Sequence, residues 1–194
     1  MVNGERHRYE WGCVHGRFQP FHTEHLEYAL RARKRCRRLI VGITNPDPTW
    51  VKHEAWSKHR HAAGSNPFTY VERALMVEGS LLDEGFEARD FLVVPFPIQD
   101  PGLCRFYVPE HAVHFVRVYS GWEEEKARRL RTQGFTVEVL DRGKEKGISG
   151  SEVRGLLQAG LEWEHLVPKA SARVIQDALT EDPRRLHAYA RGSK

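Results

Sequence analysis

Two histidines, His22 and His25, close the segment Gly16-Arg17-Phe18-Gln19-Pro20-Phe21-His22-Thr23-Glu24-His25. This segment joins a short apolar stretch to a helical pattern, so both imidazoles lie at a predicted helix start. Backbone N–H groups and the helix dipole favour an anion there, and imidazole N–H groups can follow negative charge that grows in a transition state. Arg17 adds a cation, and Gly16 allows close approach of a ligand. The pattern indicates a phosphate site. The alternative is that His22 caps the helix and His25 is a packed surface residue.

A second candidate anion site is the segment Ile148-Ser149-Gly150-Ser151-Glu152-Val153-Arg154. Its S-x-x-E pattern is typical of a capping box and predicts a helix start at Ser149. Gly150 lets a ligand approach the backbone, Ser151 offers a hydroxyl group, and Arg154 projects from the first turns. The alternative is an ordinary capped helix with a solvated arginine. The chain has neither a GxGxxG in its first loop nor a GxxxxGK[ST], so dinucleotide-fingerprint and Walker-type sites lose their main support.

Strand and helix patterns alternate along the chain. Strands are predicted over 11–15, 39–44, 91–97, 115–120 and 135–140, and helices over 23–37, 69–82, 123–133, 149–159 and 170–179. Thr23 is the predicted N-cap of the first helix, and Thr69 with Glu72 forms a capping box on the second. A strand, a loop, a helix and another strand form a βαβ unit, which implies a parallel sheet. We therefore predict an α/β fold, a doubly wound parallel five-stranded sheet with a helical C-terminal tail.

The chain is predicted to form one domain over 1–194, with a long loop or insertion at 45–67 and a helical tail from about 160 to 194. The loop holds His53, His59 and His61. Histidines at this spacing without cysteine match no structural zinc site, so we predict no metal site. A substrate lid that contains Trp50 and Trp56, or a disordered loop, are the alternatives.

Composition narrows the setting and the partners. The 194 residues are 40% hydrophobic and 29% charged, which is typical of a globular chain. The net charge of +4 suits an anionic small molecule as well as a nucleic acid. There is no apolar run of about 18 residues, no apolar segment of a secretory signal, and no CxxC among the three cysteines. We expect a cytoplasmic protein without membrane partners.

Taken together, the two phosphate motifs resemble the nucleotidylyltransferase superfamily with HxGH and ISSTxxR motifs. The resemblance extends to the archaeal-type nicotinamide-nucleotide adenylyltransferases, because five stretches occur in matching order from about 13 to 177: GRFQPFH, NPFT followed by Glu72-Arg73, VYS, ISGSEVR and WEHLVP. It implies a Rossmann-like fold and Mg²⁺-dependent transfer of a nucleotidyl group from a nucleoside triphosphate, ATP in the main interpretation, to a phosphorylated acceptor such as nicotinamide mononucleotide. It also suggests a homo-oligomer.

The resemblance assigns roles to individual positions. The catalytic residues would be His22, His25 and Arg154, the triphosphate-binding residues Gly16, Arg17, Phe18, Ser149 and Ser151, and the acceptor-binding residues Arg73, Asp100, Phe106, Tyr107 and Trp122. The acceptor phosphate is already a nucleophile, so positioning and charge stabilisation suffice for catalysis.

The sequence departs from the family at four places. Glu24 stands where HxGH has glycine, Gly121-Trp122 replaces an Asn-rich turn, the tryptophan expected beyond the third strand is missing, and residues 47–65 lengthen a loop. Three of these fall at the expected acceptor pocket, so the acceptor is predicted to have changed. The alternatives are a cytidylyltransferase for a small phosphate or phosphonate, and a non-catalytic nucleotide- or RNA-binding protein.

The RNA alternative depends on the segment 31–38, which has six basic residues among eight. No recognised nucleic-acid motif or interleaved aromatic residue accompanies it. We therefore favour a solvated helix end, where cations complement the helix dipole.

Overall fold

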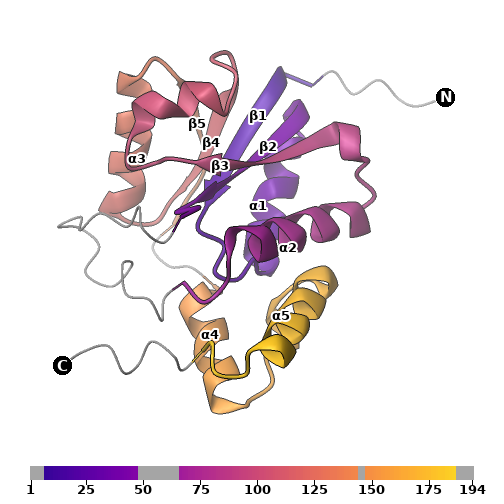
Figure 1. The fold of residues 1–194 in the computed structure, drawn as a ribbon. Helices are drawn as coiled ribbons and strands as arrows, with labels where there is room; N and C mark the ends of the chain where they lie inside the picture. Colours follow the sequence, from indigo (N-terminus) through magenta and orange to yellow (C-terminus); the bar gives the residue numbers. More distant parts are fainter. Residues whose placement is uncertain (1–6, 48–65, 144–146, 187–194) are drawn as a thin grey trace.

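The computed structural model describes residues 7–47, 66–143 and 147–186. Within them a five-stranded sheet has the order β3-β2-β1-β4-β5, and every pair of neighbouring strands is parallel. The strands are β1 Tyr9–Gly16, β2 Cys36–Thr44, β3 Phe91–Phe96, β4 Val113–Val118 and β5 Thr136–Arg142. The strand order reverses between β1 and β4, which is where ligands bind in open sheets of this kind. The predicted fold class is confirmed (Figure 1).

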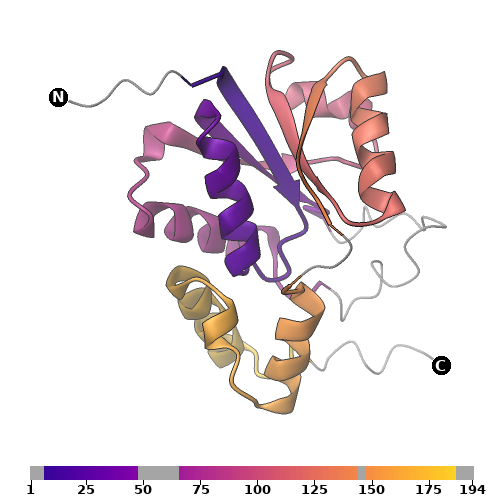
Figure 2. The ribbon, with the colours of Figure 1, turned by 180° about the vertical axis from the view of Figure 1, so that it is seen from behind.

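Helices cover both faces of the sheet. They are α1 Thr23–Arg33, α2 Tyr70–Asp83, α3 Gly121–Thr132, α4 Gly150–Ala159 and α5 Lys169–Glu181, with short 3₁₀ helices η3 Ala88–Asp90, η4 Pro101–Phe106 and η5 Glu164–Leu166. Alternate side chains of β1 divide between the faces. Val14 packs in the cluster with α1 and α2, whereas Cys13 packs in the cluster with η4 and α3. Figure 2 shows α1 and α3 on opposite sides of β1 and β4.

The first helix differs from its prediction at both ends. Its N-cap is His22 rather than Thr23, and it ends at Arg33, four residues before the predicted end at 37. Cys36 already belongs to β2, where it pairs with Tyr9 of β1. The basic run therefore crosses from a helix into a strand and does not form one helical face, because burial of Cys36 against the sheet overrides the helical pattern.

Helices α4 and α5 confirm the predicted helical tail, although α5 ends at Glu181 and residues 182–186 form no helix. α5 packs on α2 at Gly79, where a Cβ atom would lie 2.8 Å from Cβ of Ala170, and Ser80 lies within hydrogen-bond distance of Ser171. α4 lies beyond the carboxyl ends of the strands (Figure 1). In the part of the chain that the structure describes, no helix combines the length and the apolar character needed to cross a membrane. Most of the predicted 45–67 loop, with its histidines and tryptophans, lies outside the described residues.

Candidate functional site

The loop from Gly16 to Phe21 leaves β1 at the point where the strand order reverses. A Cβ atom on Gly16 would lie 2.5 Å from the ring of Phe18, so glycine is required by a neighbouring side chain. Phe18 has a positive φ of 52° and only 1% of it is exposed. Its ring packs edge-on against Phe21 and His25. The Phe18 ring thus packs against His25 and helps to fix its orientation. Because the side chain is buried, Phe18 can contact a triphosphate only through its backbone.

The two predicted catalytic imidazoles lie together at the start of α1. The rings of His22 and His25 stack with centroids 3.5 Å apart, and Nδ1 of His25 accepts a hydrogen bond from the His22 backbone N–H at 3.3 Å. An imidazole that accepts at Nδ1 carries its proton on Nε2 when neutral. His25 therefore offers an Nε2–H donor at the helix N-terminus. The alternative prediction that His22 occupies the N-cap position is confirmed.

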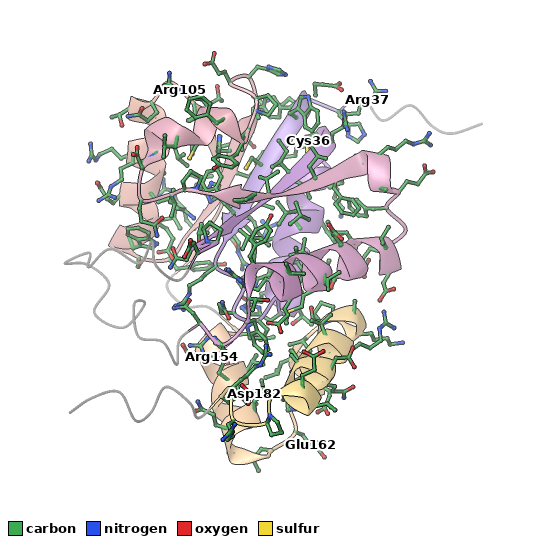
Figure 3. The ribbon with its side chains drawn as sticks, viewed as in Figure 1. Cys36, Arg37, Arg105, Arg154, Glu162 and Asp182 are labelled. Atoms are coloured by element: carbon green, nitrogen blue, oxygen red, sulfur yellow. The ribbon has the colours of Figure 1, made fainter. Side chains whose placement is uncertain are left out.

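The start of α4 meets the same loop. Nη1 of Arg154 donates to the Gln19 carbonyl oxygen at 2.5 Å and to the Gly150 carbonyl oxygen at 2.9 Å. A Cβ atom on Gly150 would lie 2.6 Å from the Gln19 carbonyl oxygen, so this glycine admits protein backbone rather than the ligand we predicted. Burial lowers the pKa of the Arg154 guanidinium. Figure 3 shows Arg154 at the junction of α4 with the rest of the fold.

The predicted capping box of α4 is confirmed. The Ser149 side chain accepts from the Glu152 backbone N–H at 3.1 Å, and the Glu152 carboxylate accepts from the Ser149 backbone N–H at 3.3 Å. Ser151 accepts a hydrogen bond from Nη2 of Arg154 at 3.1 Å. The two serines hold the helix start and the arginine in place.

Glu24, the departure from HxGH, links the two helix starts. Its Oε1 accepts from the backbone N–H groups of Gly147 at 2.8 Å and Ile148 at 3.1 Å. Its Oε2 lies 3.6 Å from Nη1 of Arg117, and Arg117 also donates to the Glu24 carbonyl oxygen. The carboxylate is thus engaged with the segment that precedes Ser149. Arg117 could not be found from the sequence, because its contact with Glu24 joins residues 93 positions apart.

Arg73 lies beneath the loop and binds backbone. Its guanidinium donates to the carbonyl oxygens of Arg17, Thr44 and Asn45 at 2.9 Å and of Thr69 at 3.1 Å. It is 2% exposed, and burial lowers its pKa to about 10. Arg73 was predicted to bind the acceptor, but in the structure its side chain holds the ends of β1 and β2 together.

The Gln19 side chain fastens the loop to the start of α2. Its amide donates to the Phe68 carbonyl oxygen at 2.8 Å and accepts from the Phe68 N–H at 3.0 Å. Arg17 reaches Asn66 at 3.5 Å. The GRFQPFH and NPFT stretches are therefore joined by hydrogen bonds in the structure. Their common occurrence in the family resemblance was the only sequence signal that linked them.

The remaining predicted acceptor residues are spread apart. Trp122 lies in the first turn of α3, directly after β4, and Asp100 precedes η4. Phe106 and Tyr107 are not brought to the phosphate residues. Figure 3 shows the adjacent Arg105 at the end of the sheet where Cys36 lies, opposite Arg154. The reason is that η4 runs back along the sheet to the start of β4, so the chain has left the carboxyl edge before it reaches them.

The basic run at the α1–β2 junction is matched by acidic side chains. Arg31 pairs with Asp141, Arg33 with Asp90, and Arg35 and Arg37 with glutamates. Each pair of this kind cancels a charge that a nucleic-acid backbone would need. The structure thus gives the RNA alternative no uniform basic surface here.

The starts of α1 and α4 thus meet at the point where the strand order reverses, with His22, His25 and Arg154 beside them. Residues 13–156 match the family described as cytidylyltransferase-like. The chain belongs to this family of nucleotidyltransferases, which confirms the predicted class of enzyme.

Particular relatives refine the comparison. The chain is 45% identical over 166 residues, 86% of its length and 90% of the relative's, to a phosphonoformate cytidylyltransferase of Streptomyces viridochromogenes. It is 30% identical over 84% of its length, and 85% of the relative's, to a nicotinamide-nucleotide adenylyltransferase of Methanosarcina acetivorans. The fold resembles a bifunctional NMN adenylyltransferase/ADP ribose pyrophosphatase from Francisella tularensis, with a TM-score of 0.66 at 14% identity. That match covers 94% of this chain and 53% of the other.

Proposed function

We propose that this chain transfers a cytidylyl group from CTP to an oxygen of a small phosphonate or phosphate, with release of pyrophosphate. The observation that carries the proposal is the meeting of the α1 and α4 starts, with His22, His25 and Arg154, at the reversal of strand order. The 45% identity to a phosphonoformate cytidylyltransferase supports CTP over ATP, because the adenylyltransferase relatives are about 30% identical. We therefore prefer the cytidylyltransferase alternative of the sequence analysis to its main interpretation, adenylyl transfer from ATP to nicotinamide mononucleotide.

The residue types suit this reaction without a covalent intermediate. An acceptor oxyanion forms the new bond to the α-phosphorus, and the bond from that phosphorus to the bridging oxygen breaks as pyrophosphate leaves with the electron pair. The Nε2–H group of His25 would donate to a non-bridging α-phosphate oxygen as its charge grows. The N-terminus of α4 and Arg154 would hold the rest of the triphosphate.

Mg²⁺ belongs to this proposal as a companion of the nucleotide. Mg²⁺ usually binds through substrate phosphates and keeps several waters, and it would neutralise charge on the leaving pyrophosphate. Among residues 7–47, 66–143 and 147–186 no three or more His, Cys, Asp or Glu side chains gather as a metal site. Glu24 is engaged by two backbone N–H groups. In this proposal the protein residues bind the triphosphate, and the triphosphate carries the Mg²⁺.

Pyrophosphate release tests the proposal. CTP and ATP are each combined with phosphonoformate, methylphosphonate, a small phosphate ester and nicotinamide mononucleotide, all with Mg²⁺. We expect turnover with CTP and a phosphonate, and His25→Ala should lower it by about 100-fold or more without loss of folding. The exposed His111 provides the control, His111→Ala, with unchanged turnover.

Each other result points elsewhere. Turnover confined to ATP and nicotinamide mononucleotide would replace cytidylyl transfer by the adenylyl reaction. Nucleotide binding without pyrophosphate release across the panel would favour the non-catalytic alternative.

A further inference from the structure

Two histidines that the proposed reaction does not use lie on the other face of β1 and β4. His15 is 3% exposed and His114 is 0% exposed, with ring centroids 5.6 Å apart. Both ring nitrogens of each have no hydrogen-bond partner among the residues that the structure describes. Buried polar groups without partners are rare and costly. Two side by side indicate that something small and polar completes them.

The position of His15 is built by its neighbours. Its ring stacks on Phe96 with centroids 4.6 Å apart and an interplanar angle of 14°. Phe96 reaches it by crossing Gly42, where a Cβ atom would lie 2.9 Å from the Phe96 side chain, and Gly42 pairs with His15 in the sheet. A glycine on β2 and an aromatic ring on β3 thus fix one imidazole on β1.

This place adjoins the phosphate residues. His15 immediately precedes Gly16, where the loop to His22 and His25 begins. His114 lies opposite Cys13 in the register of β1 and β4, so it lies one pleat deeper than His15 on the same face. At the point where the strand order reverses, the proposed phosphate-binding residues thus lie toward α1 and the two imidazoles toward α3 and η4.

The charges that face the pair favour an anion. Burial lowers the pKa of His15 well below its usual value and that of His114 to about 3, and the positive charge of Lys126 on α3 lowers both further. Both rings are therefore neutral at pH 7, and each has one N–H donor. Glu123 on the same helix is engaged by Ser120. Neutral donors beside a lysine suit a carboxylate, which accepts without giving up a proton.

We propose that His15 determines acceptor specificity by donating a ring N–H to a second anionic group, a carboxylate, of a small phosphonate acceptor, with His114 as a positioning residue behind it. The inference rests on the proposed function, which supplies the small phosphonate as the acceptor. A carboxylate one or two bonds from the phosphorus would lie toward His15 while the phosphonate oxygen faces the α-phosphate.

The test compares phosphonoformate with methylphosphonate, which lacks the carboxylate. Wild type should bind phosphonoformate more tightly by about tenfold or more, measured by calorimetry with a non-hydrolysable CTP analogue present. His15→Phe keeps a ring on Phe96 but removes both nitrogens, so the preference should disappear while the affinity for the CTP analogue stays within about twofold. His15→Asn and His15→Gln each restore one amide donor, and one of them should recover part of the preference.

Folding and function are separated by the readouts. His15→Phe should melt at or above the wild-type temperature, because an unsatisfied polar ring is replaced by an apolar one. If it fails to fold, the Asn and Gln variants carry the comparison. His111→Phe, which removes an exposed imidazole, should leave the preference unchanged.

An unchanged preference in His15→Phe overturns the inference, and so does a wild type that binds neither compound. In that second case cytidylyl transfer to another acceptor would still leave the proposed function standing. A preference that needs His15 in a protein without pyrophosphate release would support the inference and overturn the proposed function.

Discussion

Replacing Glu24 with alanine removes the carboxylate that joins the starts of α1 and α4. Two backbone N–H groups, those of Gly147 and Ile148, lose an ionised acceptor. A hydrogen bond to a charged group contributes about 1.5–3 kcal/mol. The Glu24 side chain is 17% exposed and Gly147 is exposed, so water replaces part of the loss. We expect the free energy of unfolding to fall by about 2 kcal/mol in total, which lowers Tm by about 4–8 °C at this chain length.

The same change should weaken nucleotide binding. Ser149 and Arg154 follow directly on the segment that Glu24 holds, and a looser segment costs ordering energy when the triphosphate binds. We expect the KM for CTP to rise by about tenfold, equivalent to about 1.4 kcal/mol, with a smaller change in kcat. Thermal melts and steady-state pyrophosphate release measure the two effects.

Glu27→Ala is the matched control, because Glu27 is an exposed glutamate of the same helix. It should change Tm and KM little. Glu24→Gly restores the HxGH spacing and should be worse than alanine, since glycine inside a helix costs about 1 kcal/mol more. Equal effects of the Glu24 and Glu27 variants, or higher activity of Glu24→Gly, would refute the reasoning and indicate that Glu24 acts on the triphosphate instead.

Three further predictions concern packing and pH. Gly150→Ala places a methyl group 2.6 Å from the Gln19 carbonyl oxygen and should raise the KM for CTP about tenfold or more. Its control is Gly155→Ala on the same helix, where a Cβ atom has no neighbour within 4 Å. This control should add about 0.5–1 kcal/mol to the free energy of unfolding in denaturant titrations. Arg73→Leu leaves four carbonyl groups without their donor and should lower the free energy of unfolding by about 3–5 kcal/mol in the same assay. A loss below about 1 kcal/mol would contradict the role of Arg73 in holding the strand ends together. His114 has its pKa lowered from 6.5 to about 3, so below pH 6.5 the unfolded chain binds the proton more readily and stability falls as the pH falls. From this group alone the loss is about 2 kcal/mol at pH 5, and His114→Phe should flatten that part of the pH profile.

The starts of α2 and α4 could be predicted because their capping signals are local. The Thr69–Glu72 and Ser149–Glu152 boxes each join residues three apart, and both appear in the structure. The end of α1 could not be predicted in this way. Its basic residues have good helical propensity, and only the pairing of Cys36 with Tyr9 across the sheet ends the helix at Arg33.

The candidate site shows the same difference between residues with a local sequence signal and residues whose contacts are distant in sequence. Motif spacing predicted that His22, His25 and Arg154 lie near helix starts, because residues of one motif are close together in the sequence, and the structure places them there. Phe106 and Tyr107 were assigned to the acceptor by their place after the third strand, but the preceding residue, Arg105, lies at the other end of the sheet from Arg154 (Figure 3). His15 and Arg117 lie outside every motif, and their surroundings come from strands and helices distant in sequence.

The alternation of side chains along β1 places the residues of the two proposals on opposite faces of the sheet, His15 and His114 on the α3 face and the loop that leads to His22 and His25 on the α1 face. The α1 side depends on contacts made with backbone: Gly16 under Phe18, Gly150 on the Gln19 carbonyl, and the four carbonyl groups around Arg73. Such contacts tolerate few substitutions. The α3 side depends on which side chain stands at His15 and His114, and a residue there can change without moving the loop. In the proposed reaction, the two faces of β1 therefore serve different substrates: the α1 face the triphosphate, and the α3 face the acceptor.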